Sequence, residues 1–406
     1  MKSKKKILIV YPGSIFPITM ASQVRILNMI KRLSQKHSVY FISQIEERSQ
    51  IKYQDELLKY CEEVKLIMAP NKESTIKRVI YKLVFYLFVI FKRYNSYYFY
   101  ANLIKFRNAV SQFIYLNNFD IIQVEYWFAS GFLGEINKRP YLVLDTHDVL
   151  YQQSKMTIDV LPNNFIKKWK LYLWKWEQQK EIETYDKYDS LISISRQDEC
   201  EFRKLLPRKN ILVIPVGVDI SFFCPKPELR GKNTIIFYGA MGGKPNIDAL
   251  LYLWNNILPL IQKELKIKLI IIGSNPPNRI RKLAENKWVE VTGYVQDVRK
   301  QIARGSIMIL PLRLGSGFRS RVCEVMAMEV PVVGTHNALD SIECTHGENA
   351  IVSDDPKELA KWTIEILKND TLRQRIGRNG RKLVIEKFSL EATYDKLSEF
   401  YSEVYT

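Results

Sequence analysis

The stretch from Ile309 to Thr335, ILPLRLGSGFRSRVCEVMAMEVPVVGT, constrains the fold of this chain more than any other. Its isoleucine-rich start predicts a strand buried on both faces, and Gly315 and Gly317 predict a turn. A helix through Met328 and a second short apolar strand follow. The order strand, glycine turn, helix, strand is typical of a parallel sheet covered by helices.

The same stretch has the residues of an anion-binding turn. Glycines let the backbone approach a ligand closely, and the free N–H groups of a helix start attract negative charge. Arg319 and Arg321 add cations that keep their charge at any ordinary pH. Glu324 would repel a phosphate, so it suits hydroxyl groups such as those of a ribose. These residues predict a nucleoside diphosphate across the helix start; a glycine turn with solvated charges is the alternative.

Length and charge narrow the class of protein. A chain of 406 residues that is 47% hydrophobic suits two domains of about 200 residues each. The net charge is +18, and residues 1–110 hold 20 Lys and Arg against 7 Asp and Glu. An anionic membrane, a nucleic acid or a polyanionic substrate would each explain this excess. No nucleic-acid-binding module accompanies it, so we expect no nucleic-acid partner.

Cysteine spacing and the first residues indicate a compartment. The five cysteines lie far apart without a C-x-x-C pair, so neither structural zinc nor a disulfide framework is implied. The apolar run Ile7–Val10 is too short for a signal peptide. We therefore expect a cytoplasmic protein. No D-x-D metal motif and no paired-carboxylate signature stands out, so no metal is expected.

Alternating strands and helices predict an α/β fold with two doubly wound, Rossmann-like domains. The first spans residues 1–206, and its expected strands lie at residues 6–11, 39–43, 120–124, 141–144 and 190–195. The second spans residues 207–388, and its expected strands lie at residues 211–215, 234–238, 268–272, 289–293, 307–310 and 330–333. Residues 389–406 are expected to form a last helix.

Polar residues follow two expected strands of the first domain. Glu125 comes directly after one strand, and His147 and Asp148 follow another. Ligands bind at the carboxyl ends of parallel strands in open α/β sheets. These residues are therefore candidates for substrate contact, although a lone histidine is also commonly structural.

Two segments of the first domain are both aromatic and basic. Val79–Phe91 is apolar but has only 13 residues, too few for a spanning helix, which needs about 20. Phe165–Trp176 places four aromatic residues at helical spacing among four lysines. Each segment predicts either an interfacial helix on a membrane or a helix packed on the first domain.

In these motifs, the chain resembles the retaining glycosyltransferases of the two-Rossmann (GT-B) type, family 4 and group 1. The family pattern PLR-x-G-x-G-x-R-x-K-x-x-E-A-M-A-x-G-x-PVV corresponds here to PLRLGSGFRSRVCEVMAMEVPVV. FYGAMGGKPNIDAL, VTGYVQDVRKQIARGSIMILPL and VIPVGVDISFFCP are also similar. The resemblance covers nearly the whole chain and is strongest from residue 211 to 385, while Pro17, Arg25 and DTHD match more loosely.

The resemblance implies two domains that face a cleft, with a terminal helix that crosses back to the first domain. The nucleotide would bind the second domain and the acceptor the first. The implied activity is transfer of a sugar from a nucleoside-diphosphate sugar to a glycan or lipid-linked acceptor with retained configuration. No cofactor is implied, because enzymes of this type generally act without a metal.

The resemblance also implies roles for single residues. Glu324 would hold the ribose, and the backbone at Tyr294 and Val295 would meet the base. His147 would contact the transferred sugar, and Gly239 would let the donor approach closely. Arg319 and Arg321 would be catalytic, together with His147, by stabilising the charge of the leaving diphosphate. Donor binding would further use the glycine loop and nearby residues, namely Lys244, Gly315, Ser316, Gly317 and Phe318. The acceptor side would include Arg25, Glu125 and Asp148.

Two departures from the family pattern leave other functions open. Ser316 stands where many relatives have a glutamate, and Ala240 stands where an arginine often follows the glycine. A nucleotide-sugar epimerase would use His147 and Asp148 as bases. A membrane-associated scaffold without catalysis would keep the fold alone. For the enzyme and for the scaffold alike, we expect peripheral attachment to the inner face of an anionic membrane.

Overall fold

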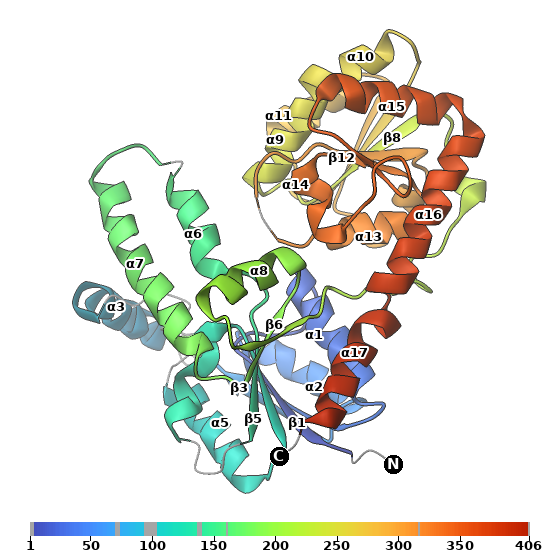
Figure 1. Cartoon of the computed structure of the whole chain (residues 1–406). Helices are drawn as coiled ribbons and strands as arrows, with labels where there is room; N and C mark the ends of the chain where they lie inside the picture. Colours follow the sequence, from blue (N-terminus) through green and yellow to red (C-terminus); the bar gives the residue numbers. More distant parts are fainter. Residues whose placement is uncertain are drawn as a thin grey trace. The chain divides into compact units, whose positions relative to one another are not determined.

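The computed structural model describes residues 4–69, 74–92, 104–135, 140–159, 161–315 and 317–404. The chain folds into two compact units (Figure 1). Unit 1 comprises residues 1–215 and 393–406, and unit 2 comprises residues 216–392. Each unit is a parallel sheet with helices packed on it, which confirms the predicted fold class.

The described part of unit 1 forms a seven-stranded sheet in the order β3-β2-β1-β4-β5-β6-β7. Its strands are β1 (Lys6–Tyr11), β2 (Ser38–Ile45), β3 (Glu63–Met68), β4 (Ile121–Glu125), β5 (Tyr141–Asp145), β6 (Ser190–Ser193) and β7 (Asn210–Val213). Residues 7–10 of the central strand β1 are fully buried, as expected for a strand covered on both faces.

The helices of unit 1 connect these strands, except α17, which returns to unit 1 from unit 2. They are α1 (Ala21–Leu33), α2 (Gln54–Leu58), α3 (Thr75–Lys92), α5 (Ile104–Leu116), α6 (Leu150–Asp159), α7 (Phe165–Tyr185), α8 (Arg196–Leu205) and α17 (Leu390–Glu403), with the 3₁₀ segments η1 (Arg48–Tyr53) and η3 (Trp127–Glu135). In α1, Ile26, Met29, Ile30 and Leu33 recur at helical spacing and are fully buried, so one apolar face covers the sheet.

The described part of unit 2 forms a six-stranded sheet in the order β10-β9-β8-β11-β12-β13. Its strands are β8 (Thr234–Tyr238), β9 (Lys268–Ile272), β10 (Val289–Gly293), β11 (Ile307–Leu310), β12 (Val332–Gly334) and β13 (Ile351–Val352). Its longer helices are α9 (Lys244–Tyr252), α13 (Ser320–Ala327), α15 (Pro356–Lys368) and α16 (Asp370–Phe388). Its shorter helical segments are η4 (Pro227–Leu229), η5 (Leu253–Ile257), α10 (Leu258–Gln262), α11 (Asn278–Arg281), η6 (Lys282–Glu285), α12 (Arg299–Ala303), α14 (His336–Leu339) and η7 (Asp340–Ile342).

The predicted boundary after residue 206 needs correction. The strand that was expected to open the second domain, β7, pairs with β6 in parallel and forms the edge of the first sheet. The chain leaves unit 1 only after Pro215. Apolar residues such as Ile211 indicate a strand but not which of two sheets it joins, so the sequence placed β7 in the wrong domain.

The C-terminal helix α17 packs on unit 1, as the fold prediction stated. Arg32 of α1 forms a two-point ion pair with Asp395 at 2.7 Å. The imidazole of His37 lies 3.0 Å from the hydroxyl of Ser398. The hydroxyl of Tyr401 donates to the amide oxygen of Gln123 on β4 at 2.5 Å. The last residues therefore complete the core of the first sheet.

The aromatic segment Phe165–Trp176 begins α7, and its four aromatic residues differ in exposure. Phe165 is 78% exposed, and Trp169 and Tyr172 are 39% and 41% exposed, whereas Trp176 is half-buried. The first part of the stripe therefore faces solvent, and packing on the domain holds only for its end. In α3, Ile76 and Leu83 are likewise exposed. The tyrosines and Arg93 that follow α3 lie outside the described residues. No described helix combines the length and apolarity that a membrane-spanning helix requires.

Candidate functional site

The carboxyl ends of strands in unit 2 hold the residues predicted to bind a donor. Gly239 follows β8, and Arg321 from the first turn of α13 lies against it: a Cβ added to Gly239 would stand 2.2 Å from the Nη1 atom of Arg321. The Nη2 atom of Arg321 donates to the side-chain oxygen of Asn246 at 2.9 Å. Asn246 in turn donates to the carbonyl of Ala240 at 2.7 Å. A strand end and the starts of two helices thus meet around one guanidinium group.

The glycine loop lies in the same place. Gly315 and Gly317 have φ values of +88° and +89°, a backbone region that favours glycine. A Cβ on Gly315 would contact Pro245 at 3.3 Å and the Nη2 atom of Arg319 at 3.4 Å. The loop therefore packs against the first turn of α9 and carries Arg319 beside it. Ser316, which was also predicted here, lies outside the described residues.

The electrostatics of this place favour an anion. Burial and the neighbouring charge of Arg319 lower the pKa of Arg321 to about 10, so Arg321 stays cationic at neutral pH. The Nε atom of Arg321 is buried and has no hydrogen-bond partner among the described residues. Two cations held close together at a helix start are stabilised by a bound phosphate group.

Glu324 lies one turn along α13 from Arg321. The hydroxyl of Tyr238, the last residue of β8, donates to one carboxylate oxygen of Glu324 at 3.0 Å. Burial raises the pKa of Glu324, while the Tyr238 bond and Arg321 oppose that shift. No described residue hydrogen-bonds the other carboxylate oxygen, so it remains available for a hydroxyl group.

The other predicted donor residues lie near the ends of unit 2 elements. Lys244 begins α9 and its side chain is exposed. Tyr294 follows β10 and is 79% exposed, whereas Val295 is half-buried against the core of unit 2. Phe318 is half-buried, with its ring 5.4 Å from that of Phe388. Phe318 thus helps to hold the loop in place.

In unit 1, the polar residues after β4 and β5 form a buried network. The Nε2 atom of His147 lies 2.6 Å from a carboxylate oxygen of Glu125, and both side chains are almost completely buried. The ring of His147 stacks on Tyr126 with centroids 4.1 Å apart. His147 and Tyr126 have φ values of +58° and +70°, which are costly for side chains of this size. Such strained positions cluster at functional sites.

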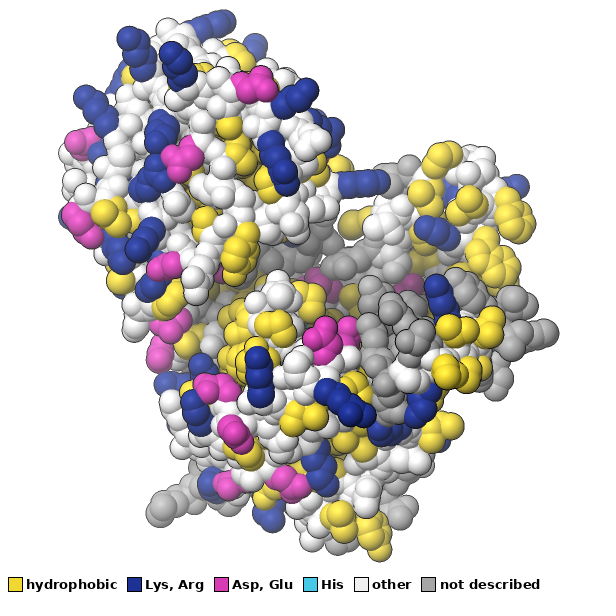
Figure 2. Space-filling view, turned by 180° about the vertical axis from the view of Figure 1, so that it is seen from behind, with side chains coloured by type: hydrophobic (Ala, Val, Ile, Leu, Met, Phe, Trp, Pro, Cys, Tyr) yellow, Lys and Arg dark blue, Asp and Glu magenta, His cyan; other side chains and the backbone are white. Residues whose placement is uncertain are grey.

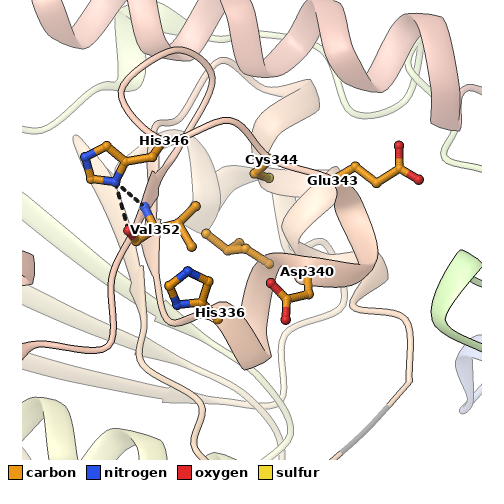
Figure 3. A pocket seen from close by; sticks show the side chains of 7 residues that line it. His336, Asp340, Glu343, Cys344, His346 and Val352 are labelled. Atoms are coloured by element: carbon orange, nitrogen blue, oxygen red, sulfur yellow. Dashed lines mark hydrogen bonds between the residues drawn. The ribbon is translucent and has the colours of Figure 1, made fainter.

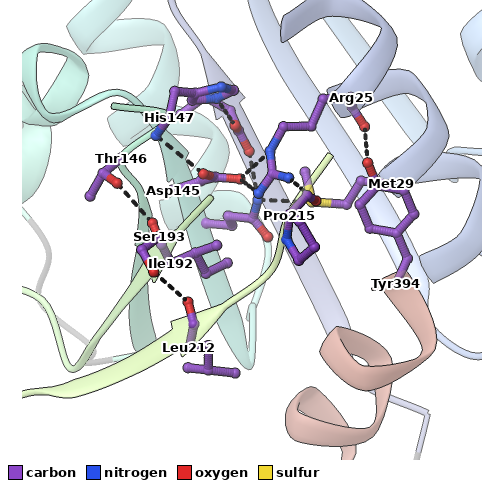
Figure 4. Close-up of polar contacts among 12 residues, drawn as sticks. Arg25, Met29, Asp145, Thr146, His147, Ile192, Ser193, Leu212, Pro215 and Tyr394 are labelled. Atoms are coloured by element: carbon purple, nitrogen blue, oxygen red, sulfur yellow. Dashed lines mark hydrogen bonds and ion pairs between the residues drawn. The ribbon is translucent and has the colours of Figure 1, made fainter. Parts of the chain in front are cut away.

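Arg25 has a different place from the one expected on the acceptor side. Its guanidinium group is 1% exposed and donates to Asp145 at 2.8 and 3.1 Å and to the carbonyl of Pro215 at 2.5 Å (Figure 4). These bonds join α1, β5 and Pro215, the residue after which the chain leaves unit 1. Arg25 therefore holds the network together from inside and does not reach the surface. Asp148, the third residue expected on the acceptor side, follows His147 in sequence and is half-buried.

Charge in the network is balanced from within. Glu125, Asp145 and His147 offer ligand atoms within 4.8 Å of one another, an arrangement that suits a metal ion. Arg25 already pairs with Asp145, however, and His147 already bonds Glu125. Burial and the neighbouring Asp145 raise the pKa of Glu125. An added cation would have to displace these internal partners.

The network continues to the end of the chain. The hydroxyl of Tyr401 on α17 donates to Gln123, whose amide nitrogen donates to Glu125 at 2.6 Å. Glu125 then meets His147, so the order is Tyr401, Gln123, Glu125, His147. Gln123 and Tyr401 were not predicted from the sequence, because no local motif contains either. Asn246 and Tyr238 were not predicted either, although both stand within the motif FYGAMGGKPNIDAL.

A small pocket of about 210 Å³ lies elsewhere in unit 2 (Figure 3). It is lined by His336, Leu339, Asp340, Glu343, Cys344, His346 and Val352. One ring nitrogen of each histidine is engaged, with Asp354 at 3.0 Å and with the carbonyl of Val352 at 2.8 Å. No residue predicted from the sequence lines this pocket.

Two family sequence models match the chain. "Glycosyltransferase Family 4" matches residues 22–222, largely in unit 1. "Glycosyl transferases group 1" matches residues 232–369, within unit 2. The two matches fall on the two Rossmann-like sheets in the order that the sequence predicted.

Among curated relatives, the capsular polysaccharide biosynthesis glycosyltransferase CapM of Staphylococcus aureus is 29% identical over 153 residues, which cover 35% of this chain and 40% of CapM. The 2-deoxystreptamine N-acetyl-D-glucosaminyltransferase of Niallia circulans is 25% identical over 201 residues, which cover 45% of this chain and 49% of that protein. The chain thus spans less than half the length of each of these two relatives.

Solved structures match over nearly the whole chain. Sucrose-phosphate synthase from Thermosynechococcus elongatus has a TM-score of 0.67 at 14% identity and covers 98% of both chains. HepE of Anabaena, solved with UDP and glucose, has a TM-score of 0.63 at 14% identity over 98% of this chain and 100% of HepE. These likenesses show the shared GT-B fold.

Proposed function

Because the chain is built as a GT-B glycosyltransferase, with a family 4 domain followed by a group 1 domain, we propose that it transfers a sugar from a nucleoside-diphosphate sugar to a glycan or lipid-linked acceptor. The relative CapM is named for capsular polysaccharide biosynthesis, which supports a role in cell-surface polysaccharide or glycoconjugate synthesis. The five cysteines are all free, which suits a reducing compartment and a cytoplasmic enzyme.

One observation carries the donor part of this proposal: Arg319 and Arg321 lie together at the start of α13, beside two left-handed glycines and above Glu324. The leaving diphosphate gains negative charge as the bond to the sugar breaks. Fixed cations and free N–H groups aimed at that charge stabilise the transition state. The free carboxylate oxygen of Glu324 accepts from a ribose hydroxyl. HepE, of the same fold, was solved with UDP.

We propose that unit 1 supplies the acceptor side and that His147 contacts the transferred sugar. Its Nε2 atom is held by Glu125, so Nδ1 is the ring nitrogen left for substrate. Retention of configuration follows from the family resemblance, and NMR of the product's anomeric proton checks it. We propose that no metal takes part, and addition of a chelator is then expected to leave the rate unchanged.

The test is a variant that removes both guanidinium groups, Arg319→Ala with Arg321→Ala. We expect turnover to fall by about 10²-fold or more, since each fixed donor of this kind contributes on that order. Calorimetry should show a matching loss of affinity for nucleoside diphosphates. Binding of a nucleoside diphosphate by the unchanged chain also separates a working donor site from a scaffold that has lost it.

Arg313→Ala is the matched control. Arg313 precedes the same loop, but it is exposed and pairs with Asp248 at 2.7 Å, away from the two guanidinium groups. We expect this variant to bind and turn over like the unchanged chain. Equal turnover in the double variant and in the control would refute the proposed roles of Arg319 and Arg321.

A further inference from the structure

Helix α7 of unit 1 turns an aromatic face to solvent. At about 100° per residue, Phe165, Trp169 and Tyr172 share one side of the helix. The side chain of Phe165 is 78% exposed, that of Trp169 is 39% exposed and that of Tyr172 is 41% exposed. Exposed aromatic residues on one helix face are unusual on a surface that meets only water. This outer face is therefore typical of a surface that binds a partner.

The opposite face of α7 does the packing. Trp174 donates its indole N–H to the carbonyl of Tyr151 on α6 at 2.7 Å, and Lys155 lies over its ring. Lys167 donates to the carbonyls of Asp159 and Leu161 at the end of α6. The inner face is thus sufficient to hold the α6–α7 hairpin. On the outer face, Trp169 and Tyr172 stack on each other with ring centroids 5.9 Å apart, and part of each ring stays exposed to solvent.

Cations flank the aromatic face. Residues 160–176 contain four lysines and no acidic residue. Lys168 and Lys175 lie on one side of the aromatic face and Lys170 on the other. These three side chains are exposed and form no ion pair among the described residues. An apolar strip bordered by lysines is the pattern of a helix that lies in the interface of an anionic membrane.

Helix α3 repeats the pattern independently. Ile76, Val79, Ile80 and Leu83 recur at i, i+3, i+4 and i+7, and each is more than half exposed. Lys77 and Lys82 are exposed beside them. Figure 2 shows apolar and basic side chains gathered over the projecting part of unit 1 that these helices form. Two helices of one unit therefore offer apolar faces with cations at their borders.

We propose that unit 1 docks on an anionic lipid membrane through the outer faces of α3 and α7, with the aromatic and aliphatic side chains inserted among the headgroups. The lysines attract the surface before the apolar side chains enter it. Trp and Tyr suit the boundary between headgroups and acyl chains. An acidic protein partner would use the lysines but would leave the aliphatic face of α3 exposed. This docking is separate from sugar transfer and needs no turnover.

Vesicle sedimentation tests the proposal with the full chain. Phosphatidylcholine vesicles with and without phosphatidylglycerol serve as the probes. We expect binding only when the anionic lipid is present. Binding should weaken as ionic strength rises, because the Debye length falls from about 30 Å at 0.01 M to about 8 Å at 0.15 M.

Two variants and one control separate the contributions. Lys168→Glu with Lys170→Glu and Lys175→Glu should lower vesicle affinity about tenfold or more at low salt. Phe165→Ser with Trp169→Ser should lower it while keeping the salt dependence. Lys232→Glu, Lys282→Glu and Lys287→Glu change the same charge at exposed positions of unit 2 and should leave vesicle binding nearly intact.

Three results would overturn the proposal. The chain could ignore anionic vesicles at low salt, or the unit 2 control could lose as much affinity as the α7 variant. The third is concentration-dependent self-association without vesicle binding, which would assign the face to a second copy of the chain. None of these results depends on sugar transfer, so each is distinct from a failure of the proposed function.

Discussion

At the scale of single residues, Gly239 is restricted by a side chain of the candidate donor site. Its φ is not left-handed, so glycine is not needed there for backbone reasons. The reason is the guanidinium of Arg321, which occupies the space of a Cβ. The end of Arg321 is flexible, so a larger residue would move it without disturbing the sheet. Gly239 therefore controls where Arg321 lies.

Gly239→Ala should separate binding from stability. We expect Arg321 to be displaced and the affinity for nucleoside diphosphates to fall about tenfold or more, since a hydrogen bond to a charged group contributes about 1.5–3 kcal/mol. The melting temperature of unit 2 should change little. Gly242→Ala is the control, because a Cβ there meets nothing within 4 Å. Equal affinities in calorimetry for both variants would contradict this assignment.

At the scale of elements, one ion-paired group ties three parts of unit 2 together. Glu290 on β10 accepts from Arg304, which follows α12, at 2.6 and 2.8 Å. It also meets Lys268 at the start of β9 at 3.0 Å. The Arg304 bonds, helped by Lys268, lower the pKa of Glu290 from 4.5 to about 2. The folded state therefore favours the ionised carboxylate more than the unfolded chain does.

The sign of this shift predicts a pH dependence. A lowered pKa stabilises the fold above pH 4.5, and the contribution disappears as pH falls through about 2. Glu290→Gln should lower the free energy of unfolding of unit 2 by about 1 kcal/mol at pH 7, a value reduced for partial exposure. Urea unfolding at pH 7 and pH 3 should show the gap between the two proteins narrowing. A gap that widens in acid would contradict the prediction.

At the scale of the whole molecule, helix α17 packs against the sheet that the first part of the chain forms. Tyr401 on α17 bonds Gln123 across 278 positions of sequence. Through Gln123 it supports Glu125 and His147. Unit 1 therefore depends on residues of α17 that lie far along the chain from its sheet. Unit 2 has its own core and does not depend on Tyr401.

Tyr401→Phe tests this dependence. The change leaves the buried amide oxygen of Gln123 without its donor, which costs about 1–3 kcal/mol. We expect the unfolding transition of unit 1 to shift while nucleoside diphosphate affinity stays unchanged. Glu399→Gln is the control on the same helix, because its side chain is exposed and lies away from Gln123 in the burial pattern of α17. Equal shifts in the two variants would show that Gln123 has another support.

The sequence alone predicted that there are two parallel sheets and the loop around Arg319 and Arg321, although the edge strands β3 and β13 were not among the expected strands. Both follow from contiguous residues: strands from runs such as 307–310, and the loop from glycines and arginines within seven positions. Local periodicity and local spacing are visible in a sequence because neighbours in the chain stay neighbours in space.

Tertiary structure alone decided which sheet β7 joins, that Arg25 pairs with Asp145 inside the protein, and that the aromatic face of α7 stays exposed. The physical reason is common to all three. A sequence shows which face of an element is apolar or charged, but the partner that covers it comes from a distant part of the chain. For Arg25 and Asp145 that distance is 120 positions.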